Sequence, residues 1–196
     1  KIVLEAMLQS PRFIYRIESH ENGELVSDDE LAVRLSYLVW GSSPDIQLHE
    51  EARQGRLNNS TSIKKQVARM LDDPKAKYQS MQFLKQWLNL NQLSNLRPDK
   101  KHYPKWTSQL AEDMKQETIS FFEELVWHRR RPLPELFNAQ FTYLTPALAT
   151  HYGITPKDKD GLERYNLEFI PSRGGLLTQG STLTMGGDEA SMVTRG

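Results

Sequence analysis

The feature that most constrains this chain is a series of apolar stripes at helical spacing, which runs through its first two thirds. Apolar side chains three or four positions apart share one face of an α-helix, and that face is stable when it is buried. The sequence therefore predicts a mainly α fold with a bundle-like helical core over residues 1–135. The helices are expected over residues 2–8, 27–40, 44–53, 63–71, 74–88 and 104–128.

Some helix ends are marked by residues that satisfy free backbone groups. Ser27 and Glu30 have the spacing of a capping box, so a helix is expected to begin there and to end at Gly41. A Ser-Pro pair at residues 43–44 offers an N-cap followed by proline at the first helical position. This pair predicts a short helix over residues 44–53.

The first segment is predicted to be a short buried helix over residues 2–8, because nearly all of its side chains are apolar. Pro11 cannot continue that helix. The residues that follow, 13–17, are rich in β-branched and aromatic side chains and are too short for a clear helical period. They are expected to form a strand or an extended segment.

Two helices are expected to dominate the core. The helix over residues 74–88 carries apolar side chains on two sides, with Met81 in one stripe and Phe83 and Trp87 in the other, and is expected to be central. The longest helix is expected to begin at Pro104. Some 25 residues at about 1.5 Å each would make it roughly 37 Å long.

The character of the chain changes after residue 135. Residues 136–196 contain short apolar elements separated by Gly and Pro, and residues 172–196 hold six of the 11 glycines. Glycine permits tight turns and close approach of the backbone. A loop-rich, Gly-rich C-terminal section, packed on the helical core, is therefore predicted for residues 136–196.

Composition excludes several classes of protein. The absence of cysteine excludes disulfides, cysteine-based zinc sites, thiol catalysis and covalent haem attachment within the chain. Lys and Arg number 25, as do Asp and Glu, so the positive surplus of a nucleic-acid binder is missing. No apolar run approaches 18 residues, so no membrane span is expected. Because the chain opens inside a predicted helix, it is expected to be part of a longer polypeptide.

The sequence motifs that usually mark catalytic or metal-binding sites do not identify such a site. The patterns of nucleophile elbows, zinc proteases and phosphate-binding loops are missing. Glu117, Glu124 and His128 share a helical face, but a solvated last turn is favoured over a metal site. Residues 158–161 fail the twelve-residue calcium template, because its first and last positions would lack carboxylates. No metal site is expected.

A small set of residues stands out as candidates for binding a ligand or a partner. The Arg-Gly-Gly turn at residues 173–175 either directs Arg173 toward an anion or forms a tight turn with Arg173 in a structural ion pair; the second interpretation is favoured. Met185 and His151 are the types that ligate haem in another module. Residues 184–189 are expected to form a polar, acidic loop. The candidates are His151, Arg173, Gly174, Gly175, Met185, Asp188 and Glu189.

Five ordered segments resemble the signatures of one bacterial family. They are LQSPRFIYR at residues 8–16, LAVRLSYLVW at 31–40, QWL at 86–88, the segment 143–154 that ends in HYGI, and RGGLLTQ at 173–179. The family consists of domains of unknown function in large secreted or periplasmic proteins that also carry c-type cytochrome modules. Some members carry carbohydrate-binding modules.

The resemblance implies a helical scaffold that positions a haem module or an electron-transfer partner outside the cytoplasm. The family pattern continues beyond a stretch echoed by residues 190–196 into a haem-binding region, so haem c is expected in a neighbouring module and not in this chain. The alternative is an enzyme or a carbohydrate-binding module with a cleft between the core and the C-terminal loops. The polar groups of that cleft would be His151, Arg173, Asp188 and Glu189. A polysaccharide would be the partner in this alternative.

Overall fold

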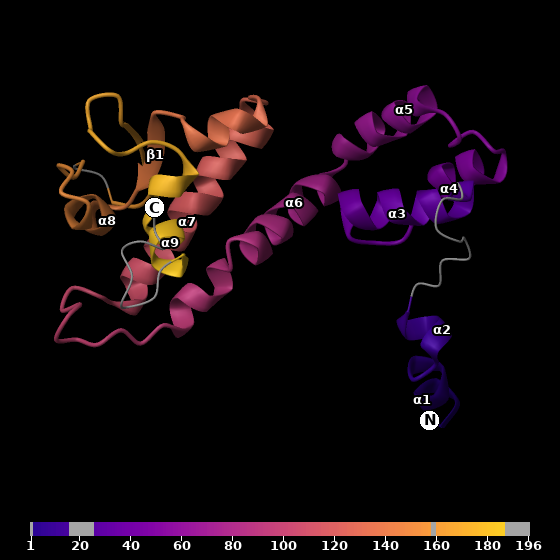
Figure 1. Ribbon diagram of the computed structural model, residues 1–196, viewed down its shortest axis with the longest axis horizontal. Helices are drawn as coiled ribbons and strands as arrows, with labels where there is room; N and C mark the ends of the chain where they lie inside the picture. Colours follow the sequence, from indigo (N-terminus) through magenta and orange to yellow (C-terminus); the bar gives the residue numbers. More distant parts are fainter. Residues whose placement is uncertain (1, 16–25, 158–159, 187–196) are drawn as a thin grey trace. The chain divides into compact units, whose positions relative to one another are not determined.

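The computed structural model describes residues 2–15, 26–157 and 160–186 (Figure 1). These residues are mainly helical and include one two-stranded antiparallel sheet, which confirms the predicted fold class. The chain divides into two compact units, Lys1–Gln79 (unit 1) and Ser80–Gly196 (unit 2). The predicted boundary at residue 135 falls inside unit 2.

Unit 1 is a group of short helices. Helix α3 contacts both α4 and α5 (Figure 1), and Trp40, Leu48 and Met70 from these three helices are buried. The indole Nε1 of Trp40 donates to the carbonyl oxygen of Met70 at 2.9 Å. The elements are α1 (Ile2–Leu8), α2 (Pro11–Ile14), α3 (Asp28–Trp40), α4 (Ile46–Arg53), α5 (Ser60–Leu71) and the first part of α6 (Pro74–Trp87).

Helix α3 has the ends that the sequence predicts. The Glu30 backbone amide donates to Ser27 Oγ at 3.3 Å, and the Ser27 amide donates to Glu30 Oε2 at 3.3 Å, which completes the capping box. Gly41 follows the last turn with φ +64°, in the left-handed region. The local sequence is therefore sufficient to define this helix.

Helix α4 begins two residues later than predicted. Asp45, and not Ser43, is its N-cap, since the Asp45 carboxylate accepts from the Leu48 amide at 2.8 Å. Both residue types can cap a helix. The helix starts at Ile46, so the expectation of a start at Pro44 is wrong.

The N-terminal segment corrects two expectations. Residues 2–8 form a helix as predicted, but α1 has no buried residue, and Ile2 is 81% exposed. Pro11 begins α2, where its fixed φ suits the first helical turn, so residues 11–14 are helical and not a strand. The backbone is extended at Tyr15. Residues 16 and 17 lie outside the described residues.

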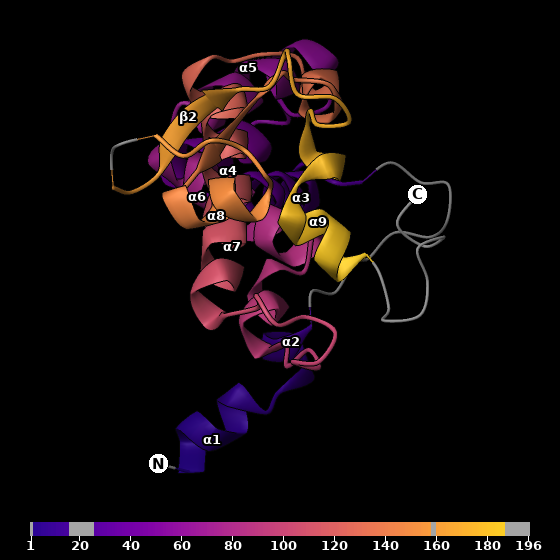
Figure 2. The same cartoon turned by 90° about the vertical axis from the view of Figure 1, so that its left-hand side faces the viewer.

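Unit 2 is built around one long helix, α7. This helix contacts β1, α8, α9 and η1, and Figures 1 and 2 show α9 alongside it. Strands β1 and β2 pair antiparallel, with Phe141 opposite Asn166. The elements are η1 (Leu90–Asn95), α7 (Ser108–Phe122), η2 (Glu123–His128), η3 (Leu133–Phe137), β1 (Phe141–Leu144), α8 (Pro146–His151), β2 (Glu163–Asn166), η4 (Leu176–Thr178) and α9 (Gly180–Met185).

The long helix starts later than predicted. Thr107 caps it by accepting from the Leu110 amide at 3.0 Å, so the helix begins at Ser108 and not at Pro104. It continues beyond Phe122 as one π-helical segment, η2. Its apolar face lies in a core where Phe121 is fully buried.

Helix α6 is buried on one side only in unit 2. Met81 and Leu84 belong to the apolar core with Phe121. Phe83 and Trp87, in the second predicted stripe, are 58% and 50% exposed and stack on each other with ring centroids 5.9 Å apart. The expectation of a helix buried on two sides is wrong, because helical spacing does not say which faces meet another element.

Candidate functional site

A buried carboxylate on α7 is the centre of the most distinctive polar arrangement in unit 2. Glu117 is only 1% exposed. Thr142 of β1 donates through Oγ1 to Glu117 Oε1 at 2.6 Å, and the Tyr152 hydroxyl donates to Glu117 Oε2 at 2.6 Å. Both carboxylate oxygens are therefore bonded by neutral hydroxyl groups from segments far along the chain.

The Tyr152 hydroxyl links the carboxylate to the C-terminal section. Thr145 caps α8 and the helix ends just before Tyr152. The hydroxyl oxygen of Tyr152 accepts from the Gly180 amide at 2.7 Å. A Cβ atom at Gly180 would lie 2.5 Å from that oxygen, so glycine is required for this contact.

Arg173 covers the other side of the tyrosine. Its guanidinium carbon lies 3.6 Å from the centroid of the Tyr152 ring, a cation-π contact. Its Nη1 donates to the carbonyl oxygen of Thr178, the last residue of η4, at 3.1 Å. We call Glu117, Thr142, Tyr152, Arg173 and Gly180 the Glu117 cluster.

The Arg-Gly-Gly turn is tight. Gly175 has φ +66°, and its amide donates to the Ala139 carbonyl oxygen at 2.9 Å. A Cβ atom there would lie 2.3 Å from the backbone carbonyl carbon of Phe137. The Gly174 amide donates to Thr178 Oγ1 at 2.9 Å. The two glycines therefore serve backbone geometry, as the favoured interpretation of a tight turn predicts. The expected ion pair of Arg173 is replaced, among the described residues, by the stacking on Tyr152 and the bond to Thr178.

Further polar contacts tie α7 to the same elements. Asp113, one helical turn before Glu117, accepts from Thr145 Oγ1 at 2.7 Å. The hydroxyls of Thr118 and Ser181 are hydrogen-bonded across 63 residues of sequence. The buried Gln179 side chain has an amide without a hydrogen-bond partner. This face of α7 thus holds α8 and α9 through buried polar groups, whose separation would be costly.

Burial dominates the electrostatics of the cluster. It raises the pKa of Glu117 to about 7, against the opposing effects of the bonds from Thr142 and Tyr152 and of the charge of Arg173. Burial and the nearby Glu117 also raise the pKa of Tyr152. Desolvation, followed by the charges of Arg173 and Lys105, lowers the pKa of His151.

The predicted site residues fall in three places. Arg173 is part of the Glu117 cluster, Gly174 and Gly175 form the turn beside it, and the His151 ring centroid lies 5.8 Å from that of Tyr152. Met185 packs against the apolar group of Leu90, Leu93 and Ala111. The remaining two candidates, Asp188 and Glu189, lie outside the described residues. Ligand or partner binding by any of these residues stays a prediction.

Sequence reasoning missed the two central residues. Glu117 entered only a comparison with Glu124 and His128, and Tyr152 only a family signature. A usable signal was present, since a carboxylate between Met114 and Phe121 interrupts the apolar stripe of α7. His128 is 57% exposed and its Nδ1 lies 3.2 Å from Glu124 Oε2, as expected of a solvated last turn.

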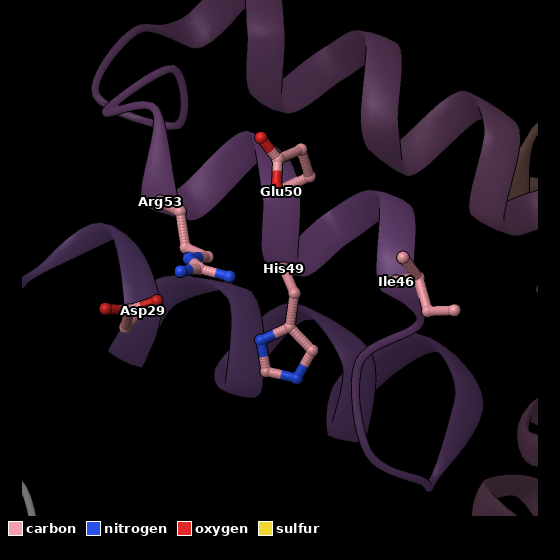
Figure 3. Close-up of a pocket in the computed structure, with 5 residues that line it drawn as sticks. All are labelled: Asp29, Ile46, His49, Glu50 and Arg53. Atoms are coloured by element: carbon pink, nitrogen blue, oxygen red, sulfur yellow. The ribbon is translucent and has the colours of Figure 1, made fainter.

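A shallow depression of about 460 Å³ lies on unit 1 (Figure 3). Asp29 of α3 faces Arg53 of α4, and His49 points toward the hollow. Ile46 and Glu50 complete its lining. Within residues 2–15, 26–157 and 160–186, no group of three His, Asp or Glu side chains is suited to hold a metal ion. The mixture of charges in the depression favours no single class of ligand.

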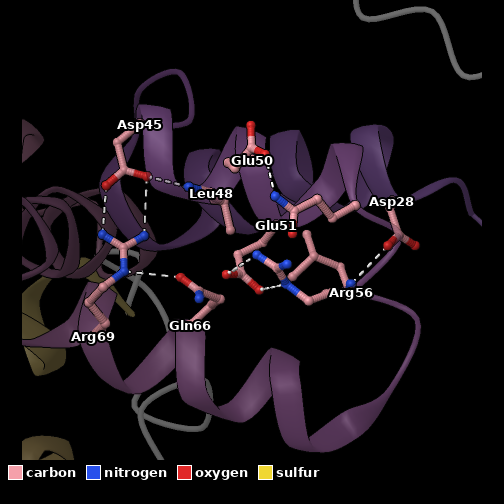
Figure 4. A network of polar contacts seen from close by, with 10 residues as sticks. Asp28, Asp45, Leu48, Glu50, Glu51, Arg56, Gln66 and Arg69 are labelled. Atoms are coloured by element: carbon pink, nitrogen blue, oxygen red, sulfur yellow. Dashed lines mark hydrogen bonds and ion pairs between the residues drawn. The ribbon is translucent and has the colours of Figure 1, made fainter.

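A polar network in unit 1 holds helices together (Figure 4). Arg69 of α5 donates from Nη1 and Nη2 to the Asp45 carboxylate at 2.6 and 3.1 Å, and from Nε to Gln66 Oε1 at 3.0 Å. Asp45 also caps α4, and the Arg69 hydrogen bond is the main cause of its lowered pKa. The network links the start of α4 to α5, which is a structural role.

The fold and the cluster define a mainly helical domain whose C-terminal turns are attached to one long helix by buried polar groups. The chain belongs to the PSD4 family, described as a protein of unknown function (DUF1592), whose family model matches residues 26–154. Membership in a family of domains of unknown function is thus confirmed over that range. No curated protein and no solved structure matches the chain. No helix among the described residues is both long enough and apolar enough to cross a membrane.

Proposed function

We propose that this chain is a helical scaffold domain of a multidomain c-type cytochrome protein located outside the cytoplasm. In this proposal the domain positions a haem-bearing module of the same polypeptide, or its electron-transfer partner, and the haem c belongs to that module. The proposal rests on the resemblance of five sequence segments to a family with this domain context.

One structural observation carries the scaffold part of the proposal. Two of the resembling segments, HYGI and RGGLLTQ, supply Tyr152 and Arg173, and both side chains are engaged within the domain. The carboxylate that they surround, Glu117, is too deeply buried to meet a substrate. Polar residues used in this way hold a C-terminal section in place, as a scaffold requires, and leave little for catalysis.

The surface beside the Arg-Gly-Gly turn suits a protein partner. Elements η3 and η4 contact each other. Leu133 and Phe137 of η3, and Leu177 of η4, are each at least half-exposed. Exposed apolar groups gathered on one part of a surface are typical of interaction sites. We assign the contact with the haem module to this part of unit 2.

The test uses the full parent polypeptide, produced in a host that attaches haem c. We expect covalent haem in the product and slower amide exchange over residues 133–137 and 176–178 than in the isolated domain. Leu177→Asp should abolish that slowing. Ile46→Asp, at an exposed apolar residue of unit 1, should leave it intact. A parent polypeptide without a haem-attachment motif, or equal exchange in both forms, would contradict the proposal.

A carbohydrate-binding module is the second candidate, favoured by the exposed stacked pair Phe83 and Trp87. Aromatic rings offer flat apolar faces on which sugar rings pack. Soluble polysaccharides should then quench tryptophan fluorescence in the native chain and lose affinity in Trp87→Ala. The control is Trp127→Phe, because the Trp127 indole is hydrogen-bonded to Ser80. Absence of quenching, or equal loss in both variants, excludes this candidate.

A further inference from the structure

We propose that Glu117 is a proton-binding site that couples attachment of the C-terminal section, residues 173–186, to pH. With the proton bound, the section is held on α7; loss of the proton leaves a buried negative charge and loosens it. This inference is independent of the scaffold proposal, because it concerns the interior of unit 2 alone.

The hydrogen bonds of the cluster can accommodate the proton. A hydroxyl group can donate or accept, so a protonated Glu117 can donate from Oε1 to Thr142 Oγ1, reversing the bond of 2.6 Å. Oε2 still accepts from Tyr152 in that state. The Tyr152 hydroxyl in turn still accepts from the Gly180 amide. Both protonation states therefore keep all three bonds.

The charges that face the carboxylate compensate it poorly. On α7 itself, Asp113 lies one turn away and is also acidic. Arg173 contributes a positive charge from the turn before η4, but its guanidinium stacks on the Tyr152 ring. At the end of α8 lie His151, its last residue, and Tyr152, its C-cap. Burial therefore prevails and disfavours the ionised form of Glu117.

Three of the remaining elements packed on α7 add no charge to this environment, whereas η2, which continues α7, carries Glu123, Glu124 and His128. Strand β1 presents the uncharged Thr142. Helix α9 presents Gly180 and Ser181. The sequence of η1, residues 90–95, contains no ionisable side chain. The balance at Glu117 is therefore set mainly by burial, which is opposed by the two hydroxyls, the charge of Arg173 and the Gly180 amide.

The sign of the pH dependence follows from the direction of the shift. The pKa of Glu117 is raised from 4.5 to about 7 in the folded chain, so the folded state binds this proton more tightly than the unfolded state. Stability from this group is complete below pH 4.5 and declines as the pH rises to about 7. The largest change that this group can cause in the unfolding equilibrium constant is about tenfold per pH unit, or roughly 300-fold between pH 4.5 and pH 7. The lowered pKa of His151 acts in the opposite direction.

The experiment compares the whole chain with Glu117→Gln, which keeps the shape of the side chain but cannot ionise. Amide exchange of residues 173–186, corrected for intrinsic rates, is measured from pH 5 to 8. We expect faster opening in the native chain as the pH rises and a flattened profile in Glu117→Gln. Glu112→Gln is the control, because Glu112 is a partly exposed residue of the same helix, bonded by Lys115 and Gln116. It should retain the native profile.

A direct measurement covers the case in which Glu117→Gln fails to fold. Carbon-13 NMR of the side-chain carboxyl in the native chain should give a Glu117 titration midpoint above pH 6. Tyr152→Phe removes a bond that favours the ionised form, so it should move the midpoint upward. A midpoint below pH 5, or the native exchange profile in a folded Glu117→Gln, would overturn the proposal.

Discussion

The two units place their polar interactions at different depths. In unit 1, Asp45 and Arg69 form a bidentate pair between side chains that are 32% and 29% exposed. In unit 2, Glu117 and Thr118 make their bonds almost completely out of contact with water. A partner lost at the surface is replaced by water, whereas a partner lost in the interior leaves a desolvated group. The loss of a hydrogen-bond partner is therefore expected to have a larger structural consequence in unit 2 than in unit 1.

The largest effect is expected from truncating the core of unit 2. Phe121→Ala removes a fully buried ring and should lower the free energy of unfolding by about 3–5 kcal/mol. Urea denaturation, with amide exchange over residues 108–128, measures the loss. The control, Phe83→Ala, removes the same ring from an exposed position and should cost far less. Equal losses would mean that burial does not distinguish the two positions.

A smaller but still large effect is expected at the Arg-Gly-Gly turn. Gly175→Ala combines left-handed φ with a clash against the Phe137 backbone, and should destabilise unit 2 by roughly 2–4 kcal/mol. Gly55 of unit 1 also has positive φ, but a Cβ atom there would have no atom within 4 Å. Gly55→Ala should therefore cost only about 1 kcal/mol. Thermal unfolding of both variants compares the two turns, and a larger loss in Gly55→Ala would contradict the assignment.

The polar network of unit 1 should give an intermediate effect. Asp45→Ala loses the cap of α4 and the Arg69 pair, which together contribute about 1–2 kcal/mol. Asp45→Asn keeps a capping side chain and should lose less. Both variants are compared with the native chain by urea denaturation.

The same variant tests the electrostatic part of that effect. Because the pKa of Asp45 is lowered below 3.8, its stabilisation is present above that pH and is lost as the pH falls through the lowered value. The difference between native chain and Asp45→Ala should therefore shrink in strongly acidic solution. A difference that stays constant down to low pH would show that charge plays no part.

The smallest effect is expected at the surface of unit 1. Glu51 accepts two hydrogen bonds from Arg56 at 2.9 and 2.8 Å, and the Arg56 side chain of this pair is 45% exposed. Glu51→Gln should leave the urea midpoint unchanged, since exposed pairs contribute little. A loss as large as that of Asp45→Ala would mean that the cap of α4 adds nothing to the effect at Asp45.

The sequence predicted helices more reliably than their ends. The capping box at Ser27 and the stop at Gly41 were readable because each signal acts within one turn. The start of α4 was not, because Ser43 and Asp45 are both competent caps and the Arg69 pair adds a tertiary contact to Asp45. The burial predicted for residues 2–8 was wrong, since an apolar composition does not specify a neighbour.

The candidate site was predictable only in part. Arg173 stood out through the two glycines that follow it, because a Gly-Gly pair marks a turn. Glu117 did not, because a single glutamate on a helix is usually solvated, and its burial depends on packing by β1, α8 and α9. The unmatched amide of Gln179 and the contact of Met185 with the η1 region likewise have no sequence signal.

The sequence by itself determined the mainly helical class and the capped ends of α3. These features depend on interactions within about four residues. Only the tertiary structure decided which apolar faces are buried and that Tyr152 reaches Glu117 across 35 residues. The physical reason is that burial and long-range hydrogen bonds require a second segment, and its position is set by the packing of the whole unit.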